Sequence, residues 1–147
     1  MKKEKLQILL LLLTTLFCTS CSQEDDIDEI FTGKTWYMNG GTINGMRLNS
    51  DVKNFYTDAG MNAYYITFTT NRFQGVLSAG TSFSGVWSAN GKHQTITLEM
   101  TSSPELSTPF DKQIYNILSS VTSYRSGADF LQLKEDSQNE VVFGNTR

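Results

Sequence analysis

The feature that most restricts the fold of this sequence is a two-residue alternation of apolar side chains, which begins at Thr35 and continues almost to the C-terminus. This period is typical of antiparallel strands that bury one face. Turn residues separate the short rows that carry it: Trp36 and Met38; Tyr64, Ile66 and Phe68; Phe73 and Leu77; Phe83, Gly85 and Trp87; Ile96, Leu98 and Met100; Leu131 and Leu133; Val141 and Phe143. The pattern predicts a mostly β domain.

Turn residues predict how two pairs of strands connect. The dipeptide Asn90-Gly91 is favoured in tight hairpins, because both central positions of a type I′ turn need positive φ. The segment 136–139 predicts a second turn, between the last two strands.

One segment departs from the alternation and predicts a helix. Thr108 is suited to the N-cap, Pro109 to the first helical position, and Asp111 to the positive end of the helix dipole. The apolar residues that follow recur at helical spacing and form one stripe: Phe110, Ile114, Ile117, Leu118 and Val121. The expected fold class is therefore α+β and mostly β, a curved, half-barrel-like antiparallel sheet with one packed amphipathic helix.

The N-terminus has the composition of a lipoprotein signal peptide. Three lysines precede an apolar run from Leu6 to Phe17, and the small residues Thr19 and Ser20 precede Cys21. The apolar run is too short for a transmembrane helix, which needs about 20 residues. This arrangement resembles the lipobox of bacterial lipoproteins, so residues 1–20 are expected to be removed and Cys21 to be acylated, which gives the protein its membrane partner.

An acidic segment follows the cysteine. Residues 21–30 are expected to form a flexible tether because of their charge. The residues directly after Cys21 also resemble a short tag that sends some lipoproteins to the outer face of the outer membrane: Ser22, Gln23, Glu24, Asp25 and Asp26. The expected location is the outer membrane, at the cell surface or in the periplasmic leaflet.

Charge and cysteine content limit the remaining domain, residues 31–147. From about Ile30 onward it has nine basic and nine acidic residues and no cluster of Lys and Arg, so nucleic-acid binding is not expected. Both cysteines, Cys18 and Cys21, lie at the signal junction, so the core must hold the domain without disulfides. Its length suits one domain.

Two features are candidates for ligand binding. Amphipathic aromatic residues are enriched at recognition sites, so Tyr37, Tyr56, Tyr64 and Tyr65, with Trp87, are candidates for a platform that binds a sugar ring or a partner. The alternative is that most of them are core or half-buried strand residues. The long connection Asn44–Asn62 is the second, since loops of this length either serve a function or decorate the surface.

No catalytic or metal site is predicted. His93 is the only histidine and follows the predicted hairpin turn, where it is expected to be exposed. The acids of the domain are scattered over predicted loops and turns, so no pair is placed for glycoside hydrolysis. No cofactor is expected, and the protein is not expected to be an enzyme.

The order of elements is similar to that of the META domain of the HslJ-like bacterial envelope proteins. The similarity depends on Gly33-Lys34-Thr35-Trp36, Ile66-Thr67-Phe68, Phe83-Ser84-Gly85-Val86-Trp87 and the apolar tail from Ile114 to Phe143. Where that family has Gly-Cys-Asn and a second cysteine, this chain has Ala79-Gly80-Thr81 and Thr101 to Pro104. The resemblance implies a curved sheet with one helix and an envelope location, and it implies no reaction.

These observations lead to one main functional hypothesis and two alternatives. The main hypothesis is a lipid-anchored envelope protein without enzymatic activity, which binds an envelope component or supports the outer membrane. The first alternative is a lipocalin-like barrel with a cavity for a small apolar ligand. The second is a surface module that binds a glycan through an outward row of aromatic residues.

Overall fold

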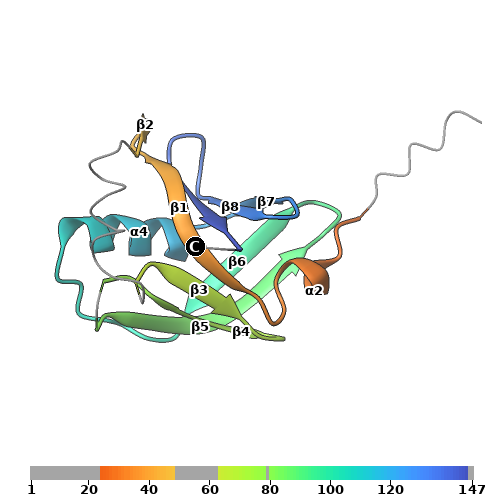
Figure 1. Cartoon of the computed structure of the whole chain (residues 1–147), viewed down its shortest axis with the longest axis horizontal. Coiled ribbons are helices and arrows are strands. Elements are labelled where there is room, and N and C mark those ends of the chain that lie inside the picture. The colour runs from red at the N-terminus through yellow and green to blue at the C-terminus, as the bar shows by residue number, and fades with distance from the viewer. Residues whose placement is uncertain (1–23, 49–62, 79, 146–147) are drawn as a thin grey trace, which may run out of the picture.

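The computed structural model describes residues 24–48, 63–78 and 80–145. These residues form a single antiparallel meander with two helices (Figure 1). In chain order the elements are α2 (Ile27–Ile30), β1 (Thr35–Ile43), β2 (Met46–Arg47), β3 (Tyr65–Phe68), β4 (Arg72–Val76), β5 (Ser82–Asn90), β6 (Thr95–Met100), α4 (Pro109–Ser119), β7 (Ser123–Ser126), β8 (Phe130–Lys134) and β9 (Glu140–Gly144).

The sheet closes into a barrel because β1 pairs with both β3 and β9. Its register with β9 runs from Tyr37 opposite Gly144 to Thr42 opposite Glu140, with a shift between Met38 and Gly40. Gly41 lies next to this irregularity, where a Cβ atom would collide with the carbonyl oxygen of Glu140. The α+β, mostly β class is confirmed. The sequence led us to expect a half-barrel, whereas the sheet forms a closed barrel. Closure was not predicted because pairing between the first and last strands leaves no signal in local periodicity.

The alternating apolar residues point into the barrel, as the sequence predicts. The rows from Trp36 to Phe143 are buried except for the half-buried Met100, and Phe31 and Tyr124 are buried with them. The outward positions of the same strands are half-buried or exposed. The core is therefore the barrel interior.

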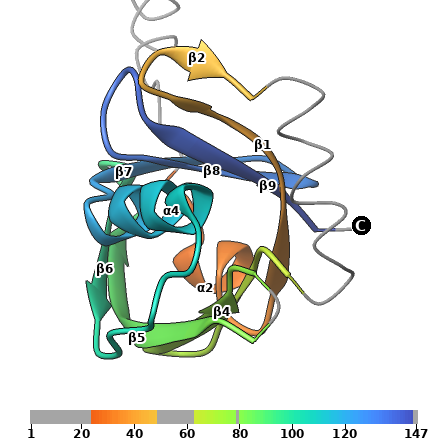
Figure 2. The ribbon, with the colours of Figure 1, turned by 90° about the vertical axis from the view of Figure 1, so that its left-hand side faces the viewer.

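Helix α4 covers one end of the barrel, as Figure 2 shows. The Thr108 side chain accepts a hydrogen bond from the Asp111 N–H at 3.0 Å, and Pro109 opens the helix. Its buried residues Ile114, Ile117 and Leu118 face β6, β8 and β9. The predicted start is confirmed, as is the buried stripe at Ile114, Ile117 and Leu118. Of the other two predicted members, Phe110 is half-buried and Val121 is buried beyond the end of the helix.

The opposite end of the barrel is covered by α2 (Figure 1), and the buried Phe31 follows this helix. The Phe31 ring packs edge-on against Phe68 and Tyr124, with centroids 5.1 and 5.2 Å apart, and also contacts Trp87. Asp26 caps α2 by accepting a hydrogen bond from the Glu29 N–H at 3.1 Å. The structure thus differs from the flexible tether expected up to residue 30, because the apolar Phe31 draws the acidic residues before it onto the barrel.

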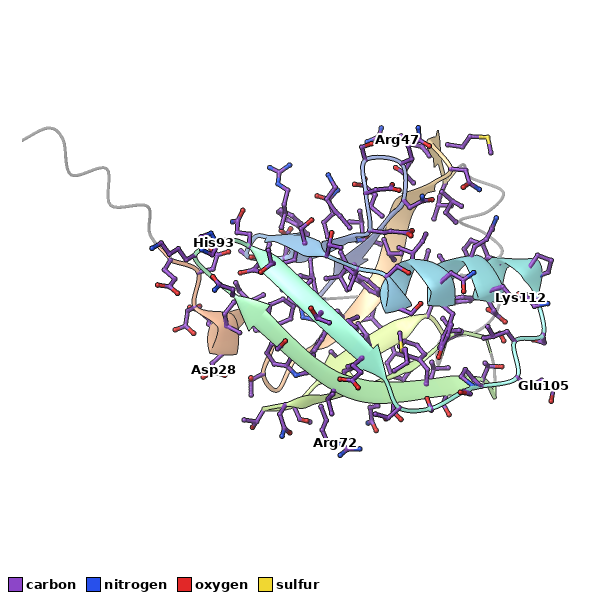
Figure 3. All side chains as sticks on the ribbon, turned by 180° about the vertical axis from the view of Figure 1, so that it is seen from behind. Asp28, Arg47, Arg72, His93, Glu105 and Lys112 are labelled. Carbon is purple, nitrogen blue, oxygen red and sulfur yellow. The ribbon has the colours of Figure 1, made fainter. Side chains whose placement is uncertain are left out.

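The β5–β6 connection is a hairpin, but the predicted two-residue type I′ turn is wrong. Asn90 pairs with Thr95, which leaves a four-residue loop, and the positive φ of 52° falls on Gln94. Gly91 has no room for a Cβ atom, because the backbone of Asp25 packs against it. Figure 3 shows His93 at the outside of this loop, and it is exposed as predicted.

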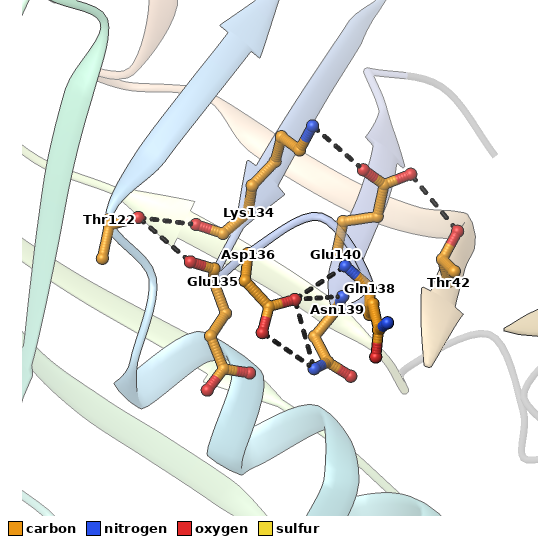
Figure 4. Close-up of polar contacts among 8 residues, drawn as sticks. All are labelled: Thr42, Thr122, Lys134, Glu135, Asp136, Gln138, Asn139 and Glu140. Carbon is orange, nitrogen blue, oxygen red and sulfur yellow. Dashed lines mark hydrogen bonds and ion pairs between the residues drawn. The ribbon is translucent and has the colours of Figure 1, made fainter. Parts of the chain in front are cut away.

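The β8–β9 turn forms where the sequence predicts it, and Asp136 holds it together (Figure 4). Its Oδ1 accepts hydrogen bonds from the N–H groups of Gln138 and Asn139, at 2.7 and 2.8 Å. The Gln138 bond is the main reason that the pKa of this carboxyl is lowered. Beside the turn, Glu140 pairs with Lys134 at 3.6 Å and accepts a hydrogen bond from Thr42.

The described strands and helices all lie between residues 24 and 145, and so do the core contacts among them. A chain that begins at residue 22 therefore retains this whole core. Among these residues, no helix has the length and apolar character to cross a membrane.

Candidate functional site

One surface feature with the dimensions of a binding site is a groove on the outer face of β3, β4 and β5. Tyr65 lies opposite both Tyr37 and Val76, and Val76 lies opposite Ser82, so the four residues form one row across four strands. The groove beside this row has a volume of about 350 Å³, within the range of small-molecule sites. We call it the Tyr65 groove; it is lined by Tyr65, Gln74, Gly75, Val76, Ser82, Phe83, Ser84 and Ser102.

The groove combines an aromatic wall with polar groups. The side chains of Gln74, Ser82 and Ser84 project outward from β4 and β5, since the alternate residues Phe73 and Phe83 face the core. Gly75 leaves space that the Phe83 ring fills, because a Cβ atom there would collide with that ring. The site therefore presents amide and hydroxyl groups beside a tyrosine ring, without a charged side chain.

The segment after β6 forms one edge of the groove and ties it to α4. The Ser84 N–H donates a hydrogen bond to Ser102 Oγ at 2.7 Å, and the Thr101 N–H donates to the Ser84 carbonyl at 2.9 Å. From the helix, Tyr115 Oη donates to the Ser102 carbonyl at 2.9 Å. These bonds fix the groove edge before any ligand binds.

The four tyrosines predicted as ligand-binding residues have different positions. Tyr37 and Tyr65 come together on the outer face, with ring centroids 6.1 Å apart and planes inclined by 54°. Tyr56 lies outside the described residues, as do positions 49–62 of the long connection. Tyr64 lies in the core, 3% exposed, so the structure does not place it on a platform; Trp87 is likewise buried and donates to the Thr69 carbonyl.

Tyr64 instead belongs to a buried polar cluster around Asp111. Its Oη donates to Asp111 Oδ1 at 2.7 Å, and Ser78 Oγ donates to Asp111 Oδ2 at 2.8 Å. Burial raises the pKa of the Tyr64 phenol, and the hydrogen bond to Asp111 and its charge raise it further. A carboxylate surrounded by donors in this way is structural, because it has no open side toward a substrate.

The barrel interior near α4 leaves no room for a ligand. The void there has a volume of about 10 Å³, at the limit for one water molecule. Strand residues such as Met38 and Phe143 surround it together with Ile114 and Leu118 of the helix. In the region that these side chains line, the cavity required by the lipocalin-like alternative is absent.

The residues of the predicted export tag are partly described. Cys21, Ser22 and Gln23 lie outside the described residues. The Asp25 carboxylate accepts hydrogen bonds from Tyr124 Oη at 2.9 Å and from Gln94 Nε2 at 3.1 Å. Burial first, and then the bond to Asp25, raise the pKa of Tyr124. In the part of the chain that the structure describes, no three His, Cys, Asp or Glu residues converge as metal ligands.

Sequence reasoning did not identify Gln74, Ser84 or Ser102 as groove residues. The sequence does contain a signal for Gln74 and Ser84. Each directly follows an inward phenylalanine, Phe73 or Phe83, so the alternation places it on the outer face of a strand, and a short connection joins the two strands. Ser102 has no such signal, since its place depends on how the segment after β6 returns to β5.

Comparison with known proteins assigns the chain to one family by sequence. Residues 22–145 match a family model described as "Domain of unknown function (DUF4847)". No curated protein matches the chain.

Two solved structures have the same fold. The crystal structure of a DUF4847 family protein from Bacteroides vulgatus is 22% identical, with a TM-score of 0.68, over 82% of this chain and 98% of that one. A protein structure determined by NMR is 18% identical, with a TM-score of 0.52, over 82% and 96%. At these identities the likeness concerns the fold alone.

The expected resemblance to the META domain is wrong, because the family model that matches residues 22–145 is DUF4847. The residues that suggested it are glycines and alternating apolar residues around one helix. Such residues are what any small antiparallel barrel with a packed helix requires, so they do not distinguish one family of this shape from another.

Proposed function

The chain belongs to the DUF4847 family of domains of unknown function, and on this premise we propose that it is a lipid-anchored envelope protein that binds a carbohydrate without catalysing a reaction. The observation that carries the proposal is the Tyr65 groove. The barrel interior near α4 has no room for a ligand, and in this groove on the outer surface an aromatic ring adjoins hydroxyl and amide groups.

The chemistry of the groove suits a sugar. A sugar ring has an apolar face that packs on an aromatic side chain, and hydroxyl groups at its edge that need hydrogen-bond partners. The Tyr65 ring supplies the first, and Gln74 with Ser84 supplies the second. The absence of charged residues among the lining side chains favours a neutral saccharide over a phosphate or a carboxylate ligand.

The lipid anchor is supported by the sequence. The run from Leu6 to Phe17 followed by Thr19, Ser20 and Cys21 fits a signal peptide that ends at an acylated cysteine. Two or more acyl chains suffice for stable membrane attachment. The outer membrane is the proposed location, with the barrel beside its lipid surface.

No catalytic role is proposed, because the described residues place no general base or nucleophile at the groove. Its hydroxyl groups belong to Tyr65 and to three serines, and none of the residues that line the groove is a histidine or an acid. The Ser102 hydroxyl is engaged with the backbone of Ser84, since it accepts from the Ser84 N–H and donates to the Ser84 carbonyl. The proposed role is therefore recognition.

A glycan array probed with the chain from residue 22 onward tests the proposal. Binding to a neutral glycan should fall about tenfold in Tyr65→Ala, which corresponds to about 1.4 kcal/mol, whereas Phe130→Ala should bind normally. Phe130 is a matched control because it is an aromatic residue, 37% exposed, on β8 and outside the groove. Equal binding by both variants, or no glycan bound at all, would contradict the proposal.

A further inference from the structure

The chain is fixed to the barrel very close to the residue that is expected to carry the acyl chains. Asp25 is held at the end of the barrel that α2 covers, because its carboxylate accepts hydrogen bonds from Tyr124 Oη at 2.9 Å and from Gln94 Nε2 at 3.1 Å. Tyr124 is buried, so the first of these bonds joins Asp25 to the core. Cys21 precedes Asp25 by four positions.

The short stretch between Cys21 and Asp25 limits how far the barrel can stand from a membrane. An extended chain spans at most about 3.6 Å per residue, so the four steps between these residues cover at most about 14 Å in any conformation. Acyl chains on Cys21 hold that residue at the lipid surface. In the anchored protein, the α2 end of the barrel therefore stays within this distance of the lipid head groups.

Two connections between strands lie at this same end of the barrel. The β5–β6 loop contains Gly91, against which the Asp25 backbone packs, and its Lys92 and His93 side chains are exposed. The β7–β8 turn lines a surface hollow together with Asp25. Both connections are therefore held near the lipid surface when Cys21 is anchored.

The Tyr65 groove lies at the other end of the barrel. Strand β5 joins the two ends, since Ser82 at its beginning lines the groove and Asn90 at its end precedes the loop that contacts Asp25. The eight residue steps along this strand correspond to about 25 Å. Figure 3 shows His93, in the β5–β6 loop, and Glu105, before α4, at opposite ends of the molecule. The groove is thus separated from the anchored end by the length of a strand.

Charge does not draw the α2 end onto a membrane. Four exposed acids lie there, Glu24, Asp26, Asp28 and Glu29, and anionic lipid head groups repel them. The covalent tether is therefore what keeps this end near the lipid. Because the attachment is at one end, the opposite end lies farther from the surface on average.

We infer that the α2 end of the barrel, with the β5–β6 loop and the β7–β8 turn, is the face that stands against the lipid surface, and that the Tyr65 groove opens at the end away from it. The inference rests on the lipid anchor of the proposed function. It also narrows the ligand of the groove. A glycan that approaches from outside the anchoring membrane reaches the groove, whereas the sugar head group of a lipid in that membrane does not.

Energy transfer to a dye on lipid head groups measures this orientation. In the anchored protein Cys18 is removed and Cys21 is acylated, so an introduced cysteine is the one free thiol of the chain. Full chains with His93→Cys or Glu105→Cys, both exposed positions, are purified from membranes, labelled with a donor dye and placed in phosphatidylcholine vesicles that contain the acceptor. Transfer from position 93 should exceed transfer from position 105 by roughly twofold or more, because a strand length separates the two ends.

Two comparisons make the result decisive. Lys92→Cys and Lys112→Cys are a second matched pair, because they replace exposed lysines in the β5–β6 loop and on α4, and they should give the same order. A linker of about 20 Gly and Ser residues between Gln23 and Glu24 adds roughly 25 Å of reach, so it should make transfer from the two ends nearly equal. Far-UV circular dichroism checks that every labelled chain is folded.

Failure of the inference can be told apart from failure of the anchor. Equal transfer from both ends of a vesicle-bound chain, or greater transfer from position 105, overturns the orientation and leaves the anchor in place. A difference that persists unchanged in the linker variant also overturns it, since the reach from Cys21 is then not the cause. A full chain that does not enter vesicles, or that gives the same transfer with Cys21→Ala, refutes the lipid anchor and the inference with it.

Discussion

Tyr64 Oη donates a hydrogen bond to Asp111 Oδ1 across 2.7 Å, which joins the residue before β3 to the first turn of α4. Asp111 is fully buried, and Ser78 donates to its other oxygen. A buried carboxylate is tolerated only with such partners. The bond therefore fixes where α4 enters the barrel end and makes the helix part of the core.

The first prediction concerns this bond. Tyr64→Phe should lower the free energy of unfolding by about 1–3 kcal/mol, because a buried hydrogen bond to a charged group is lost. Tyr65→Phe, on the outer face, should change it by less than about 0.5 kcal/mol. Urea unfolding of the chain from residue 22 measures both, and equal stability of the two variants would show that the bond does not anchor α4.

The second prediction concerns high pH. The pKa values of Tyr64 and Tyr124 are raised mainly by burial, so the folded state keeps protons that the unfolded state releases above about pH 10. Their contribution to stability is present below about pH 10 and is lost as the pH rises further. Urea midpoints compared at about pH 8 and pH 11 should show this loss.

The matched variant for the pH prediction combines Tyr64→Phe with Tyr124→Phe. This variant lacks both phenol groups whose pKa values are raised, so its stability should fall less between the two pH values than that of the wild type. The same decline in both proteins would assign the alkaline loss to other groups.

The third prediction concerns the packing of α4. Leu118 is 1% exposed and faces the barrel interior, so Leu118→Ala should cost about 2–5 kcal/mol by opening a cavity. Gln113 lies on the exposed face, and Gln113→Ala should change stability by less than about 0.5 kcal/mol. Denaturant unfolding of both variants measures the two changes in the free energy of unfolding. Small decreases in both variants would mean that the helix does not pack against the barrel interior.

Much of the fold follows from local sequence signals. The alternation places Trp36, Ile66 and Phe143 inward, and the Thr108-Pro109 pair marks the start of α4; the structure has each of these features. Such signals depend only on strand and helix periods and on capping, which act over a few residues.

Features that depend on distant contacts were not predictable in this way. Closure of the sheet needs β1 to meet β9, and the loop at Gly91 packs against the backbone of Asp25, which is 66 positions earlier in the sequence. Packing of Phe31 into the barrel end likewise depends on rings from β3 and β7. The binding surfaces share this limit: Tyr37 and Tyr65 lie 28 positions apart in the sequence, and only their strand register makes them neighbours.

The fourth prediction concerns the lipid anchor. Cys21→Ala removes the thiol that would be acylated, so the protein should leave the membrane fraction or keep its signal peptide. Cys18→Ala is the matched control, because Cys18 follows the large Phe17 and is the poorer acceptor. Normal membrane fractionation of Cys21→Ala would contradict the lipoprotein assignment.

The last prediction concerns the acidic tag, and the structure decides how it should be tested. Asp25 holds the N-terminal segment on the barrel through Tyr124, so replacing it would disturb the fold as well as the charge. Glu24→Gln with Asp26→Asn removes two charges, and asparagine is still a good N-cap for α2. If these charges direct the protein to the cell surface, labelling of intact cells by an added antibody should fall.

Tyr124→Phe weakens the hold on Asp25 but keeps every charge, so its labelling should match the wild type. Two results would contradict the prediction: reduced labelling of Tyr124→Phe, or unchanged labelling of the variant with Glu24→Gln and Asp26→Asn. Either result would mean that the acids stabilise the end of the barrel and do not determine the membrane leaflet.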